Sequence, residues 1–185
     1  YDFVFRNEII PDHYFQGIGS GTGAISVWEA SKRFVERNKF GNKVPILHLG
    51  QNYPYDPVVK AWKKNSCDFE VEDLIDKPKE KIKTLSATML SNRTPPYSVS
   101  GGLFDALCDS NGQMYSVNNK AVESAMKIFE DTEGIDIVPE AGVAIASLRK
   151  AIQLKNINPT DNILVNITGG GYARLQEDYT ISQIP

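Results

Sequence analysis

The stretch Gln16-Gly17-Ile18-Gly19-Ser20-Gly21-Thr22-Gly23-Ala24 decides how this chain is interpreted, because it joins a short predicted strand at 13–18 to a predicted helix at 24–37. Glycines let a backbone turn tightly and come close to a ligand. The free N–H groups and the positive dipole end of a helix start favour a phosphate. Ser20 and Thr22 add hydroxyl donors. The loop is therefore predicted to hold a phosphate group, and a tight turn without a ligand is the plainer alternative.

Two common phosphate loops match this stretch poorly. Loops that bind nucleoside triphosphates contain Gly-Lys-Ser or Gly-Lys-Thr, and no lysine follows Gly23. The dinucleotide-binding pattern fits loosely, with Gly19, Gly21 and Ala24 in its three positions, but it requires an acidic residue after the next strand. That strand is followed by Gly50-Gln51-Asn52, which has no carboxylate. A non-catalytic nucleotide- or dinucleotide-binding domain remains the alternative from another class.

Strands and helices alternate through the rest of the chain. Apolar spacing and turn residues predict strands at 44–49, 113–117, 135–138 and 162–168, and helices at 57–64, 79–90, 101–108, 120–131 and 140–154. The opening segment 1–5 resembles a further strand. This order predicts an α/β fold, with a mainly parallel, twisted sheet and helices on both faces.

A second candidate site closes the last predicted strand. Thr168 is followed by Gly169-Gly170-Gly171, and the carboxyl ends of parallel strands are where α/β proteins bind ligands. A hydroxyl in that position can reach a ring nitrogen while the glycines keep the backbone clear of the ring. A flexible strand exit is the plainer alternative. Together, the phosphate loop and Thr168 suit a phosphorylated heteroaromatic cofactor such as pyridoxal phosphate (PLP).

Composition excludes several classes of protein. The chain has 185 residues, of which 41% are hydrophobic and 23% charged, with a net charge of −3. Disorder is not expected at this apolar content, and the acidic pI near 5.5 gives no footprint for nucleic acid. No apolar run is long enough for a membrane span. Cys67 and Cys108 form neither a disulfide scaffold nor a metal site, and we expect two reduced, buried thiols in a cytoplasmic protein.

We expect structural roles for the two histidines and for two of the arginines. His13 and His48 are the only histidines, and with no partners for a metal site or a catalytic triad in view we expect both to be structural. Arg93 and Arg174 are expected to form surface ion pairs, with contact to a substrate phosphate or sulfonate as the alternative.

Three motifs resemble the fold-type II PLP enzymes, a group that includes threonine synthase, cysteine synthase and the tryptophan synthase β-subunit. The stretch 19–25 resembles their phosphate loop, 132–144 resembles the segment beside the cofactor ring, and 167–171 resembles the loop whose hydroxyl bonds the pyridine nitrogen. The resemblance implies the large domain of the tryptophan synthase β-like fold. It implies cofactor contacts from Gly19, Ser20, Gly21, Thr22, Gly23, Ala24, Thr168 and Glu133, and no metal.

Within this family the chain resembles the cysteate synthases of methanogenic archaea, relatives of threonine synthase. Five stretches carry this resemblance: 5–8, 16–24, 91–97, 112–115 and 166–171. It implies replacement of the phosphate of O-phospho-L-serine by sulfite to give L-cysteate, a step of coenzyme M biosynthesis, in a cytoplasmic homo-oligomeric enzyme. Threonine synthase, acting on O-phosphohomoserine, is the alternative inside the family.

The chain departs from the family in one respect. The Schiff-base lysine of these enzymes lies in a Ser-Phe-Lys-type motif before the phosphate loop, and the chain has no such motif. Lys32, the nearest lysine, lies in the predicted helix after the loop. We therefore expect residues 1–185 to form a single α/β domain, the C-terminal PLP-binding domain of a longer two-domain enzyme. No catalytic residue is assigned to the chain, which is expected to be inactive alone.

Overall fold

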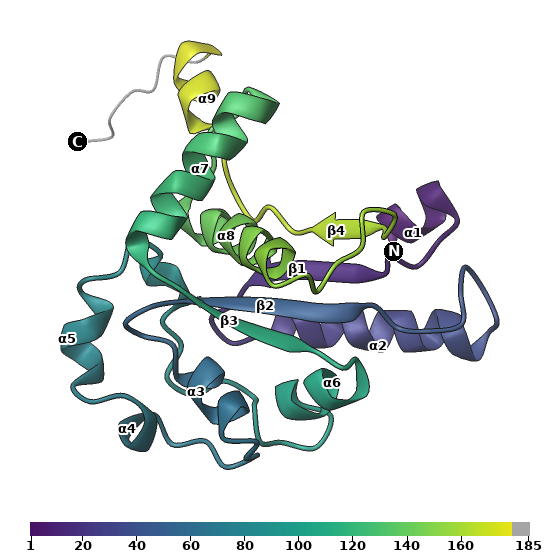
Figure 1. Ribbon diagram of the computed structural model, residues 1–185, viewed down its shortest axis with the longest axis horizontal. Coiled ribbons are helices and arrows are strands. Elements are labelled where there is room, and N and C mark those ends of the chain that lie inside the picture. Colours follow the sequence, from purple (N-terminus) through teal and green to yellow (C-terminus); the bar gives the residue numbers. More distant parts are fainter. Residues whose placement is uncertain (179–185) are drawn as a thin grey trace.

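A four-stranded parallel sheet forms the centre of the computed structural model, which describes residues 1–178 and all their side chains except that of Asp73 (Figure 1). The strands are β1 (His13–Gly17), β2 (Ile46–Asn52), β3 (Gln113–Val117) and β4 (Ile163–Val165). Their order is β3-β2-β1-β4, and each pair is parallel. The predicted fold class is confirmed.

Helices cover both faces of this sheet (Figure 1). One face carries α2 (Thr22–Glu36), α3 (Pro57–Lys63) and α6 (Leu103–Asp109), and the other carries α7 (Asn119–Glu133) and α8 (Pro139–Gln153). The shorter elements are α1 (Asp2–Asn7), α4 (Val71–Leu74), α5 (Pro78–Ile82), the 3-10 turn η1 (Thr88–Leu90) and α9 (Tyr172–Asp178). Each crossover between parallel strands runs through at least one helix, as parallel pairing requires.

Alternate residues of the strands point into two different cores. Leu47 and Leu49 are fully buried and pack on the side of α2, α3 and α6, together with Trp28. Phe15 is buried on the opposite face, beneath α8. A Cβ at Gly50 would lie 2.2 Å from the Ser147 hydroxyl oxygen of α8, so this helix rests directly on the backbone of β2. This close contact fixes the position of α8 over the sheet.

Two predicted elements are wrong. Segment 1–5 was expected to be strand-like but lies in helix α1, where an Asp2–Arg6 ion pair spans one turn and Phe5 packs edge-on against Phe34. The predicted helix at 79–90 is only α5, and after a break the turn η1. Leu85 and Ala87 lie in that break and are buried in different cores. Residues on one face of a continuous helix would pack into the same core.

The predictions for the last third of the chain hold in part. The expected strand at 135–138 is reduced to one antiparallel bridge between Ile137 and Gly170. The expected strand at 162–168 pairs only over β4, because the chain then leaves the sheet toward that bridge. Among residues 1–178, no helix combines the length and the apolar content that crossing a bilayer demands.

Candidate functional site

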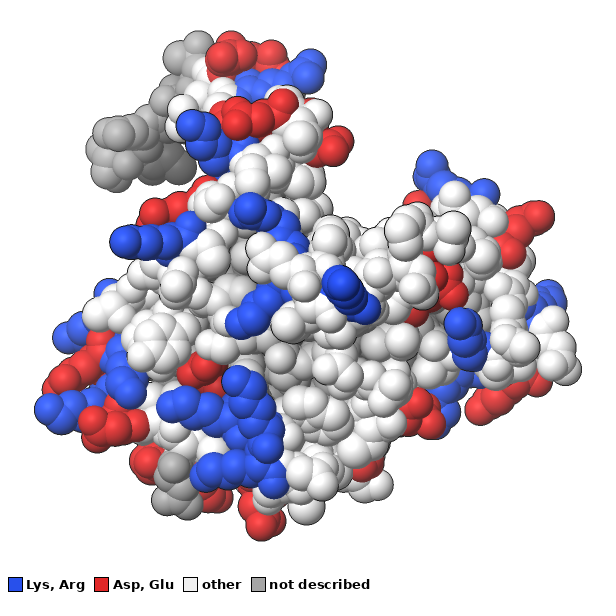
Figure 2. Space-filling model, in the orientation of Figure 1, with Lys and Arg blue, Asp and Glu red and all other residues white. Residues whose placement is uncertain are grey.

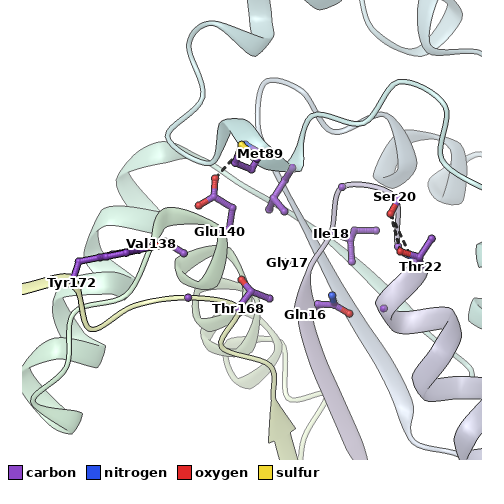
Figure 3. A pocket seen from close by; sticks show the side chains of 15 residues that line it. Gln16, Gly17, Ile18, Ser20, Thr22, Met89, Val138, Glu140, Thr168 and Tyr172 are labelled. Atoms are coloured by element: carbon purple, nitrogen blue, oxygen red, sulfur yellow. Dashed lines mark hydrogen bonds between the residues drawn. The ribbon is translucent and has the colours of Figure 1, made fainter. Parts of the chain in front are cut away.

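A cavity of about 440 Å³ opens beyond the carboxyl end of β1 (Figure 3). This volume falls within the range of small-molecule sites, about 300 to 1,000 Å³. Four parts of the chain line the cavity: the loop between β1 and α2, the turn η1, the amino end of α8, and the segment from β4 into α9. The lining residues are Gln16, Gly17, Ile18, Gly19, Ser20, Gly21, Thr22, Gly23, Met89, Leu90, Val138, Glu140, Thr168, Gly169 and Tyr172.

The glycines of the first loop are required by its geometry. Gly21 is the N-cap of α2 and has φ 79°, a left-handed conformation that a side chain disfavours. A Cβ there would lie 2.6 Å from a methyl group of Leu103. At Gly23 a Cβ would lie 2.7 Å from the side-chain nitrogen of Gln16. The sequence therefore packs this loop against its neighbours while leaving its other side open to the cavity.

The same loop offers hydrogen-bond donors to the cavity. The hydroxyl oxygens of Ser20 and Thr22 lie 3.1 Å apart. No side chain caps α2, and within residues 1–178 the backbone N–H groups of Gly23 and Ala24 donate no hydrogen bond. The first turn of this 15-residue helix has no acidic residue. Free donors and the positive end of the helix dipole together favour an anion.

Thr168 lies across the cavity from this loop, in the segment that follows β4 (Figure 3). Backbone hydrogen bonds hold that segment against 136–138: the N–H of Val138 donates to the carbonyl of Gly169 at 3.1 Å, and the N–H of Gly171 to that of Asp136 at 2.8 Å. A Cβ at Gly170 would lie 2.2 Å from the Asp136 carbonyl oxygen. The three glycines therefore let the backbone of this segment pack closely against 136–138, and this contact positions Thr168.

The amino end of α8 forms the third wall. Pro139 occupies the first turn of the helix, where its missing N–H leaves no hydrogen bond unmade. An oxygen of the Glu140 carboxylate accepts the N–H of Met89 at 3.2 Å, which ties the turn η1 to α8. Glu140 lies in the stretch 132–144 that resembles the segment beside the cofactor ring, but neither Glu140 nor Met89 is among the residues predicted to contact a cofactor. The start of a helix at Pro139 was visible in the sequence, but the contact with η1 is tertiary and leaves no local signal.

Six of the eight residues predicted to contact a cofactor line this one cavity: Gly19, Ser20, Gly21, Thr22, Gly23 and Thr168. Ala24 is fully buried in the core, so its side chain serves packing. Glu133 is the last residue of α7, is exposed and is absent from the lining. Its expected position beside a cofactor ring remains a prediction.

The cavity fits a ligand with a phosphate at one end and a ring at the other. Unpaired N–H donors and two hydroxyls stand on the α2 side. The Thr168 hydroxyl, which forms no hydrogen bond within residues 1–178, stands on the opposite side. Phosphate and ring contacts in one cavity are what PLP requires.

The two histidines have structural roles, as predicted. His13 and His48 are both buried and hydrogen-bonded to each other, to Asp161 and to Tyr115. Burial, reinforced by the neighbouring His13, lowers the pKa of His48 to about 3. Among residues 1–178, apart from the side chain of Asp73, no cluster of three or more candidate metal ligands forms.

The two cysteines and the arginines Arg93 and Arg174 lie at the surface of the protein. Cys67 and Cys108 are unpaired, but both are exposed, so the prediction of buried thiols is wrong. Each sits in a polar surface turn or at a helix end, where the chain has little to pack over it. Arg93 pairs with Glu72, and Arg174 lies 3.7 Å from Asp178, which agrees with surface ion pairs.

Comparisons with known proteins show the family to which the chain belongs. The family model described as pyridoxal-phosphate dependent enzyme matches residues 6–169. Cysteate synthase of Methanosarcina acetivorans is 50% identical over 175 residues, and that of Methanosarcina barkeri is 48% identical. Each alignment covers 95% of this chain and 42% of the relative, so the chain spans about two fifths of their length.

Solved structures agree on the fold. A threonine deaminase from T.th. matches with a TM-score of 0.60 over 97% of this chain and 54% of its own. An L-serine ammonia-lyase from Rhizomucor miehei matches with a TM-score of 0.59 over 95% and 52%. Their sequence identities are 12% and 14%, so these likenesses concern the arrangement of the backbone.

Proposed function

Because the chain belongs to the family of pyridoxal-phosphate dependent enzymes, we propose that it is the cofactor-binding part of a cysteate synthase. One observation carries the proposal: the glycine loop and Thr168, about 150 residues apart in the sequence, line the same cavity. The identity of 50% with a cysteate synthase supports this choice within the family.

The residues of the chain have distinct roles in this proposal. The free N–H groups at the start of α2, with Ser20 and Thr22, bind the cofactor phosphate. The Thr168 hydroxyl donates a hydrogen bond to the ring nitrogen and keeps that atom unprotonated. Glu140 holds the turn η1 against the cavity. When bound, PLP supplies the electron sink for chemistry at the α-carbon of an amino-acid substrate.

The proposed reaction replaces one group on the β-carbon. The C–O bond of O-phospho-L-serine breaks and releases inorganic phosphate. Sulfite then forms a C–S bond at the same carbon, which gives L-cysteate, a step of coenzyme M biosynthesis. The alternative within the family is threonine synthase, which acts on O-phosphohomoserine and water.

We place the remaining catalytic groups outside this chain. No lysine lines the cavity within the described residues, so the lysine that anchors the cofactor is assigned to another part of the enzyme. Residues 1–185 then act as one α/β unit that binds PLP and is inactive alone. The enzyme as a whole is proposed to be a cytoplasmic homo-oligomer.

An assay of the full-length protein that contains this chain tests the proposal. With phosphoserine and sulfite we expect release of phosphate and formation of cysteate, measured by mass spectrometry. Activity with phosphohomoserine instead would favour threonine synthase.

The dinucleotide alternative is tested on the chain itself. Its ribose contact would need an acidic residue at the end of β2, where Asn52 instead bonds the carbonyl of Val117 and the N–H of Ala87. We expect PLP to bind and NAD not to compete with it. Saturable NAD binding at residues 16–24 would contradict the proposal.

A further inference from the structure

A second cavity, of about 310 Å³, lies between α7 and α8, beyond the carboxyl end of β3. It shares no lining residue with the cofactor cavity. Its polar lining residues are Ser116, Asn118, Ser124, Arg149, Lys150 and Gln153. The proposed function uses none of them, so this cavity needs an explanation of its own.

Two cations are held at this cavity by neutral partners. A guanidinium nitrogen of Arg149 donates to the hydroxyl oxygen of Ser124 at 3.0 Å. The ammonium of Lys150 donates to the backbone carbonyl of Ser116 at 3.1 Å. Both side chains keep further N–H donors free of these contacts, because a guanidinium has five and an ammonium three.

The cavity has no negative charge of its own. Its lining contains no acidic residue, and within residues 1–178, leaving out the side chain of Asp73, neither Arg149 nor Lys150 forms an ion pair. Figure 2 shows basic side chains, and no acidic ones among them, over the place where Figure 1 shows α8. Two neighbouring cations without a counter-charge repel each other, so an anion that binds both is stabilised.

The amino end of α7 adds to this field. Asn118, the N-cap of the helix, and Ala121 both line the cavity, and the Asn118 side chain accepts the N–H of Ala121 at 2.9 Å. The positive end of the dipole of this 15-residue helix therefore lies on the same side as the two cations. The helix end supports the site, and the two cations define it.

We propose that this cavity binds the phosphate group of a small molecule. Arginine presents a planar fork that matches phosphate oxygens, lysine adds a point charge, and hydroxyls complete the set of donors. The cavity volume is at the lower end of the range for small-molecule sites, about 300 Å³, which suits a phosphomonoester rather than a dinucleotide. The proposal does not depend on the function of the first cavity.

Residue-resolved NMR of the ¹⁵N-labelled chain separates the two cavities. Inorganic phosphate and O-phosphoserine are titrated in turn, with serine as the probe that lacks the phosphate. We expect saturable shifts of the amides of 116–124 and 149–153 with both phosphate probes and none with serine. Shifts confined to 16–24 would overturn this proposal, while the proposed function would stand.

Substitutions then assign the binding to the two cations. Arg149→Gln and Lys150→Gln are each expected to weaken phosphate binding at 116–124 by about tenfold, as loss of a charge-assisted hydrogen bond predicts. Lys127→Gln is the matched control, because Lys127 is an exposed cation of α7 outside the cavity, and its binding should match the unchanged chain. Arg149→Lys keeps the positive charge and replaces Arg149→Gln in the experiment if that variant does not fold.

Three results would overturn the proposal. The first is an equal affinity for phosphate in the unchanged chain and in Lys150→Gln. The second is a set of shifts that sodium chloride reproduces at the same ionic strength, because that would reflect screening alone. The third is a titration that does not saturate.

Discussion

The Nδ1 atom of His13 lies 2.9 Å from the Nε2 atom of His48, in the interior of the sheet. This contact belongs to a chain of hydrogen bonds that crosses from β3 to the residue two before β4. Tyr115 donates its hydroxyl proton to Nδ1 of His48 at 2.8 Å, and Nε2–H of His13 donates to Asp161 at 2.9 Å. With Nε2–H of His48 donating to His13, every donor in this chain of hydrogen bonds has an acceptor. A proton added to Nδ1 of His48 would displace the hydrogen bond that the Tyr115 hydroxyl donates there.

Acid should therefore destabilise the fold through His48. Its pKa falls from 6.5 to about 3 on folding, so between these values the unfolded chain binds the extra proton. Stability is fully present above pH 6.5 and is lost as the pH falls toward 3, with a slope of up to about 1.4 kcal/mol per pH unit from this residue. Urea unfolding of the chain from pH 7.5 to 4 measures this slope. In His48→Gln the slope should be smaller, and an unchanged slope would contradict the assignment.

Tyr115→Phe should destabilise the fold. The substitution leaves Nδ1 of His48 buried without its donor, which costs about 1–3 kcal/mol. Tyr53→Phe is the matched control, because Tyr53 is 55% exposed and the loss of its hydroxyl should change stability by less than about 0.5 kcal/mol. Chemical denaturation followed by circular dichroism compares the two. Equal stability of both variants would mean that the hydrogen-bonded chain contributes nothing.

Gly21→Ala should weaken PLP binding. The new Cβ would lie 2.6 Å from a methyl group of Leu103 and force the loop to move. The left-handed backbone at this position costs any side chain about 1–2 kcal/mol more. Gly101→Ala carries the same left-handed penalty, with φ 71° but open space around it, and lies outside the cavity. We expect both variants to lose stability and only Gly21→Ala to lose affinity for PLP in equilibrium dialysis. Equal affinities would show that the loop does not hold the cofactor.

Thr168→Val should also weaken PLP binding, by a different route. The change keeps the shape of the side chain and removes its hydroxyl, so about one net hydrogen bond is lost, or roughly five- to tenfold in affinity. The absorption band of the bound cofactor should shift as well, because the ring nitrogen loses its partner. Thr160→Val, at an exposed position, is the control. An unchanged spectrum in Thr168→Val would place the ring elsewhere.

Local patterns predicted the central elements well. The strand at 113–117 and the two long helices α7 and α8 were expected within a few residues, because their apolar periodicity and their Asn118 and Pro139 starts are local signals. Segment 1–5 was mistaken for a strand because its helical form depends on contacts with Phe34 and Phe40, which are distant in the sequence. Its short alternation carried too little information to choose between the two.

The candidate site divides in the same way. The loop 19–23 and Thr168 were found because glycines and hydroxyls at strand ends are visible in sequence. The turn η1 was missed because Met89 and Leu90 reach the cavity only through the fold, and Met89 is held there by Glu140. Residues with a local conformational reason were therefore predictable, and those placed by packing were not.

The pairing of β1 with β4 has a consequence for how the cofactor cavity is made. His13 lies opposite Ile163 in the sheet, so the two halves of the cavity are brought together by a pairing of residues 150 positions apart in the sequence. Closing a loop of this length carries an entropic cost that a contact between near neighbours in the sequence does not carry. A chain growing on a ribosome can build the phosphate loop early, but the wall that contains Thr168 does not exist until β4 has left the exit tunnel. Both walls of the cavity are therefore in place only once β4 has paired with β1.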